Sequence, residues 1–143
     1  MKARNSKKFF GRDDCDLRRR GVAAAELAVC LPVIVLLVLA MIESCTMIFL
    51  KQSLTVAAYE GIRTSLEERA VEADVRAACQ QVLTDRSVQG GTINVDPVNF
   101  ERLAPGEYIS VTITAPADPN SVIPGSFYRG KTLSATATMM KEL

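Results

Sequence analysis

The stretch LAVCLPVIVLLVLAMIESCTMIFL, residues 27–50, decides the fold of this protein. Its first sixteen residues carry no charge, and seven more uncharged residues follow Glu43. A helix over this stretch is about 36 Å long, enough to cross a hydrocarbon core about 30 Å thick. A buried core helix is the alternative, but a chain of 143 residues has too little other apolar sequence to surround one. The stretch therefore predicts a transmembrane helix, which we place at residues 22–50.

The charges on either side of this helix predict its orientation. Residues 1–21 contain eight Lys or Arg and three Asp, a net charge of +5, and the remainder carries −4. Because Lys and Arg favour the cytoplasmic side, we expect a cytoplasmic N-terminus and an extracytoplasmic C-terminal part, in a single-pass protein of the cytoplasmic membrane. The basic segment could instead bind nucleic acid, but basic residues beside a span are usually topology signals. We expect no nucleic-acid partner.

The composition argues against catalysis and metal binding. The chain has no histidine, which removes the commonest general base and most zinc sites. Its four cysteines (Cys15, Cys30, Cys45 and Cys79) show no CxxC spacing. The acidic residues of its outer domain are scattered: Asp85, Asp96, Glu101, Glu107 and Asp118. We therefore expect no catalytic residue, no metal, no cofactor and no small-molecule substrate, and the protein is predicted not to be an enzyme.

Three kinds of N-terminal signal combine a basic segment with an apolar run. A secretory signal is cut after its apolar region, but this run is too long, and residues 53–58 continue a helical pattern. The stretch Leu27-Ala28-Val29-Cys30 looks like a lipoprotein signal, yet the apolar run follows the cysteine instead of preceding it. The third kind is a prepilin-type leader, which is cut after a glycine with a glutamate five residues beyond. Gly21 followed by Val22-Ala23-Ala24-Ala25-Glu26 resembles that arrangement.

Further motifs follow in order along the chain. Leu31-Pro32 precedes an aliphatic run, Ile42-Glu43 closes it, and Ala57-Ala58-Tyr59-Glu60-Gly61-Ile62-Arg63 comes after it. Together with the arginines at 18–20, residues 18–63 resemble the TadE-like family of pilus-assembly proteins. Leu27 stands where that family often has an aromatic residue, and Ser44-Cys45 replaces its usual aromatic–glycine pair. The C-terminal half carries no motif of the family.

The resemblance implies a minor pilin-like (pseudopilin) component of a tight-adherence, or Flp-type, pilus or related secretion apparatus. Such a protein is processed by a prepilin peptidase, here between Gly21 and Val22, and acts by assembly. Its implied partners are the lipid bilayer, the peptidase, other pilin-like subunits and pilus assembly proteins. The alternative is an unprocessed single-pass anchor carrying a small extracytoplasmic binding or scaffolding domain. A membrane-anchored enzyme is a third hypothesis, disfavoured by the missing histidine.

Two acids and a proline within the apolar helix are candidate assembly residues. Glu26 lies about 6 Å along a helix from the α-amino group that a cut before Val22 would create. The resemblance implies pairing with that amine in a neighbouring subunit, and the alternative is an acid that reaches the membrane surface alone. Glu43 lies about 25 Å further and about 100° around, near the outer interface. It is either simply tolerated there or contacts another membrane component, and Pro32 is expected to kink or loosen the helix.

The rest of the chain predicts an α+β, pilin-like fold. An apolar stripe with a period near 3.6 continues the helix to about Asp85, and Gly61 within it predicts a close contact. Beyond Gly90-Gly91, residues 92–95, 108–114 and 132–139 alternate like strands. We expect one long N-terminal helix, transmembrane in its first half and amphipathic in its second, with a small antiparallel three-stranded sheet. The predicted segments are a leader at 1–21, the transmembrane helix at 22–50, the amphipathic helix at 51–88 and a β-rich domain at 89–143.

Overall fold

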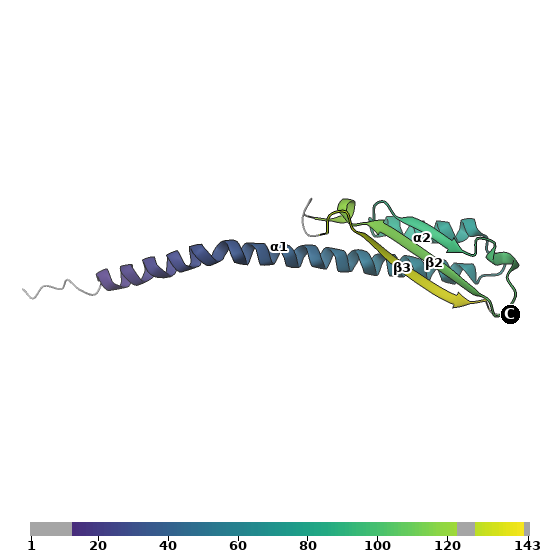
Figure 1. Ribbon diagram of the computed structural model, residues 1–143, viewed down its shortest axis with the longest axis horizontal. Helices are drawn as coiled ribbons and strands as arrows, with labels where there is room; N and C mark the ends of the chain where they lie inside the picture. Colours follow the sequence, from purple (N-terminus) through teal and green to yellow (C-terminus); the bar gives the residue numbers. More distant parts are fainter. Residues whose placement is uncertain (1–12, 123–127, 142–143) are drawn as a thin grey trace, which may run out of the picture. The chain divides into compact units, whose positions relative to one another are not determined.

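The computed structural model describes residues 13–122 and 128–141, with side chains from Gly21 onward. Its elements are α1 (Asp13–Ser65), α2 (Glu72–Asp85), β1 (Thr92–Asp96), the short 3-10 helix η1 (Phe100–Arg102), β2 (Tyr108–Pro116), a second 3-10 helix η2 (Asp118–Asn120) and β3 (Thr132–Met140) (Figure 1). The predicted α+β class, with a long N-terminal helix and a three-stranded antiparallel sheet, is confirmed. The described residues form two compact units, divided between Leu39 and Ala40 within α1.

Residues 21–39 of α1 expose their side chains in every direction. All residues from 21 to 39 are exposed, including large apolar ones such as Leu36 at 61 % and Val29 at 77 %. Leaving this much apolar surface in water is unfavourable by about 25 cal/mol for each Å². In the described part of the chain, α1 is the one helix long and apolar enough to cross a membrane. Its exposure is that of a membrane anchor.

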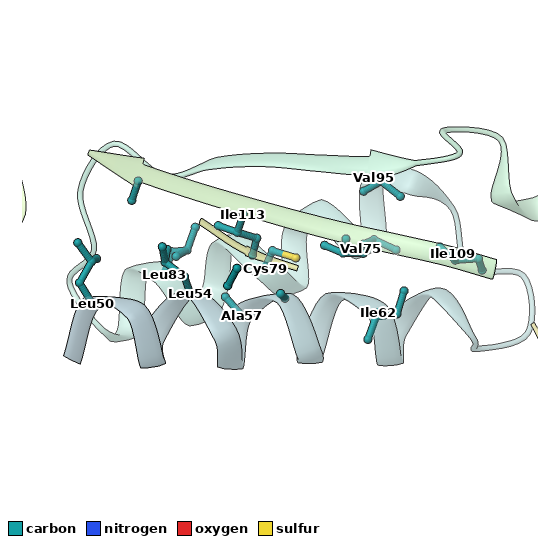
Figure 2. Close-up of a cluster of buried hydrophobic side chains, with 14 of the residues drawn as sticks. Leu50, Leu54, Ala57, Ile62, Val75, Cys79, Leu83, Val95, Ile109 and Ile113 are labelled. Carbon is teal, nitrogen blue, oxygen red and sulfur yellow. The ribbon is translucent and has the colours of Figure 1, made fainter. Parts of the chain in front are cut away.

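The second half of α1 packs one face into the core of the other unit. The buried stripe consists of Met47, Leu50, Leu54, Ala57, Ala58 and Ile62. These residues recur every three or four positions, so they share one face of the helix. Figure 2 shows this face against α2, which contributes Val75, Cys79 and Leu83, and against the sheet.

The helix expected to run to about Asp85 is instead broken into two. α1 ends at Ser65 and α2 begins at Glu72, while Arg69 between them has a positive φ of 66°. The Asp74 carboxylate accepts a hydrogen bond from the Val71 amide at 3.0 Å and caps the start of α2. The prediction was wrong because the apolar stripe resumes after the turn at nearly the same period. The turn itself is charged at residues 67–69, and it allows α2 to pack beside α1.

Gly61 lies at a close contact between α1 and α2, as a glycine within the helix predicted. A Cβ built on Gly61 would overlap the Cys79 Sγ atom and lie 3.3 Å from Val111 Cγ1. Glycine therefore permits α1, α2 and β2 to meet at one point. Burial raises the pKa of the Cys79 thiol to about 11, and a backbone hydrogen bond and the Arg76 charge oppose that rise.

The sheet has the order β1-β2-β3, and both pairs of strands are antiparallel. The central strand β2 alternates along its length, with Ile109, Val111, Ile113 and Ala115 buried. Ile113 lies opposite Ile93 in β1 and Ala135 in β3, so the buried side chains of all three strands share one face. The three predicted strands are confirmed, and each ends one or two residues beyond its predicted range.

Candidate assembly site

The expected processing site lies within α1. Gly21 and Val22 are both helical and exposed, Val22 at 59 %. A Cβ at Gly21 would meet no described atom within 4 Å, and glycine in a helix interior costs about 1 kcal/mol relative to alanine. Packing within the described residues therefore gives no reason for a glycine at position 21.

Glu26 is exposed on the same helix, one turn further along. Among the side chains described from Gly21 onward, none forms a hydrogen bond or ion pair with its carboxylate. Its neighbours on α1 include the apolar residues Val22, Leu27 and Val29. Each of these three side chains is more than half exposed. A carboxylate in this position has to find a partner outside the described chain or reach the polar edge of a bilayer.

Glu43 has the opposite environment. It is only 1 % exposed, and its position continues the buried stripe of α1 by one turn before Met47. The Ser121 hydroxyl donates a hydrogen bond to Glu43 Oε1 at 3.3 Å. Burying a carboxylate is costly unless hydrogen bonds satisfy it. The bond from Ser121 therefore reduces the cost of placing Glu43 in the core at the start of the folded domain. The structure thus gives Glu43 a partner within its own chain.

The loop that presents Ser121 is itself tied down. The Asn120 side-chain amide donates to the carbonyls of Gln89 at 2.8 Å and Pro116 at 2.9 Å, and its oxygen accepts from the Gln89 amide at 2.8 Å. Asp118 accepts a hydrogen bond from the Gly130 amide at 3.0 Å. Sequence reasoning missed Ser121 because it lies 78 residues from Glu43. The only local signal was the turn-forming run Asp118-Pro119-Asn120.

Pro32 lies inside α1, and the helix is continuous on both sides of it. A proline here removes one backbone donor, which membrane helices tolerate. The expected kink stays a prediction.

One hollow in the described structure has no arrangement that suggests a reaction. It has a volume of about 720 Å³ and lies between the α1–α2 turn, Phe100, Glu101 and Lys141. The Lys141 ammonium donates to the carbonyls of Phe100 at 3.1 Å and Glu101 at 3.0 Å. This cation therefore holds the end of β3 against η1, which is a structural role.

The fold and these residues define a class of protein: an apolar helical anchor joined to a small α+β domain, with one acid exposed on the anchor and one buried in the domain. Residues 21–63 match the model of the TadE-like protein family, which confirms the resemblance over that segment. That family implies a component of Tad pilus assembly and is generally non-enzymatic. No curated protein and no solved structure matches the chain. The matched segment covers the anchor and the packed half of α1, while α2 and the sheet lie outside it.

Proposed function

We propose that this protein is a minor pilin-like subunit of a tight-adherence pilus or a related secretion apparatus. It is anchored in the cytoplasmic membrane with its N-terminus inside and its α+β domain outside. A prepilin peptidase cuts it between Gly21 and Val22, and it then acts by assembling with other subunits and pilus assembly proteins. The observation that carries the proposal is the exposed Gly21-to-Glu26 segment at the start of the family match.

The physical case rests on Glu26. A charged side chain at the centre of a membrane helix costs roughly 2.5–3.5 kcal/mol, and less near the edge where Glu26 lies. A cut before Val22 creates an α-amino cation about 6 Å away along the helix axis. Within one chain the two groups are poorly placed to pair, but the amine of a neighbouring subunit can approach the exposed carboxylate. Such a pair lowers the cost of placing both charges in a medium of low dielectric constant.

The cut is tested by mass spectrometry of the N-terminus of the protein isolated from membranes of cells that make the peptidase. We expect a chain that starts at Val22, and a Gly21→Leu variant that keeps its leader. Gly21→Ala is the matched control for folding, because a methyl group at this position meets no described atom. An intact leader on the unmodified protein would overturn the proposed processing and favour the unprocessed anchor.

The docking role of Glu26 is tested separately. Glu26→Ala is expected to insert and be cut normally but to co-purify with fewer pilus subunits, because the amine of the neighbour loses its partner. Glu26→Gln keeps the size of the side chain and removes its charge, so it should behave like Glu26→Ala. If both variants retain their partners at the level of the unmodified protein, the docking role is wrong.

A further inference from the structure

The outer edge of β3 exposes a row of backbone groups. Along an antiparallel strand, residues alternate between bonding to the neighbouring strand and pointing away from it. The amide of Ala117 donates to the Lys131 carbonyl and the Lys141 amide donates to the Glu107 carbonyl, each at 2.8 Å, so odd-numbered residues bond toward β2. The Ser134 carbonyl instead accepts a hydrogen bond from the Lys51 ammonium. Even-numbered residues therefore point their backbone groups away from β2.

Three of these outward residues are open to solvent. Thr136, Thr138 and Met140 are exposed, Met140 at 48 %. Within the described residues, the outward amides and carbonyls of these three have no hydrogen-bond partner. The strand is nine residues long and contains neither a charged residue nor a proline. It is thus a long, neutral edge with unpaired backbone donors and acceptors.

The opposite edge of the sheet is protected in the usual ways. β1 has only five residues, ends at Asp96 and is followed by Pro97. The Arg76 guanidinium from α2 donates to the outward carbonyl of Ile93 at 2.8 Å. Natural sheets block edges with short strands, charges and prolines because an open edge pairs with other strands. The edge at β1 therefore has a short strand, charged residues and a proline, whereas the second half of β3 has none of these features.

We propose that the edge of β3 at residues 136–140 binds an extended strand of another protein. This partner strand has an acidic residue whose carboxylate lies beside Lys51. A row of alternating amides and carbonyls is best satisfied by a second strand. The charged side chain that bonds to this edge in the described structure is the cationic Lys51, so an acidic residue of the partner can pair with it. This interaction goes beyond the proposed assembly through Glu26 and depends on neither the cut nor that residue.

A second copy of this chain fits the edge less well. Both figures show β2 running opposite to α1, so β3 runs in the same general direction as α1. Antiparallel pairing of two β3 strands would therefore run the two α1 helices in opposite directions. The apolar segments, each at the N-terminal end of its α1, would then be joined to opposite ends of the paired domains. Parallel pairing about a two-fold axis would place Lys51 of one copy opposite Lys51 of the other, and like charges repel. An acidic strand from a different protein avoids both conflicts.

The test uses the full chain in lipid nanodiscs and short synthetic peptides of alternating Thr and Val that carry Asp at either end. We expect at least one Asp peptide to slow amide exchange at Thr136 and Thr138. The amide of Thr112, which belongs to the central strand, serves as the internal control and should not change. Replacing the Asp by Lys should weaken binding about two- to fivefold, the range of an exposed ion pair, and Lys51→Met should remove that difference.

Thr138→Pro provides the matched blocking variant, with Thr138→Ala as its control. Proline removes the outward amide of residue 138 and leaves the bonds between β2 and β3 in place, so the fold should persist while peptide protection is lost. Thr138→Lys makes the same test with a charge if the proline variant unfolds. Three results would overturn the proposal: no protection by either Asp peptide, equal protection in a folded blocking variant, or protection that rises with protein concentration alone. The last would identify a second copy as the occupant.

Discussion

The two halves of α1 differ both in apolar content and in what surrounds them. Residues 21–39 expose apolar side chains on all sides, whereas from Met47 onward one stripe is buried under α2 and the sheet. Their acids differ in the same way, because Glu26 is exposed and Glu43 is 1 % exposed. One helix therefore leaves its first acid exposed on the anchor and buries its second in the core of the folded domain. The comparison predicts different results for matched substitutions in the two halves.

The largest difference is expected between two leucines of this one helix. Leu54 is fully buried and Leu36 is 61 % exposed. Leu54→Ala removes core contacts and leaves a cavity, so it should lower the free energy of unfolding of the domain by about 2–5 kcal/mol. Leu36→Ala should change it by less than about 0.5 kcal/mol. Hydrogen exchange of the β2 amides in nanodiscs measures both, and equal effects would show that the two halves are not distinct.

The contact between the helices should be the next most sensitive point. Gly61→Ala places a methyl group against Cys79 Sγ and Val111, so it should destabilise the domain by about 1–3 kcal/mol despite the better helix propensity of alanine. Cys79→Ala removes the obstructing sulfur. The double variant should therefore be more stable than the sum of the single effects by at least about 0.5 kcal/mol. Strict additivity would mean that the two positions do not touch.

Glu43→Ala should have a smaller effect that Glu26→Ala lacks. It removes the acceptor of the Ser121 hydroxyl, so the domain should lose about 1–2 kcal/mol and the amides of residues 118–121 should exchange faster. Glu26→Ala should leave both quantities unchanged because its side chain is exposed on the anchor. A Glu43→Ala variant with unchanged exchange at 118–121 would show that the buried acid does not hold this loop.

Local periodicity was enough to predict most of the architecture. The charge-free run predicted the anchor, and alternation predicted the strands, because burial on one face repeats every two residues in a strand and about every 3.6 in a helix. The break at 66–71 was missed because the stripe resumes with nearly the same phase, and charged residues on a solvated turn resemble those on a solvated helix face. Periodicity constrains the faces of elements and says little about where a helix ends.

The candidate site was predictable only in part, for a related reason. Gly21 and Glu26 are close in sequence, so their spacing could be read directly. The environment of Glu43 depends on Ser121, and the open edge of β3 depends on which strand lies at the side of the sheet. Both are consequences of long-range packing. Neither leaves a pattern within a few residues of the position concerned.

The smallest effect on stability is expected for a test of thiol reactivity, which compares a buried position with an exposed one. Burial raises the pKa of Cys79 from 9.0 to about 11, which at pH 8 leaves about a hundredfold less reactive thiolate. In a chain whose other cysteines are replaced by serine, maleimide should therefore label Cys79 much more slowly than a cysteine placed at the exposed Gln80 in a Cys79→Ala background. Because the folded pKa is the higher one, the stabilising contribution of the neutral thiol is complete below pH 9 and is lost as the pH rises toward 11. Equal labelling rates at pH 8 would show that α2 does not bury Cys79 against Gly61.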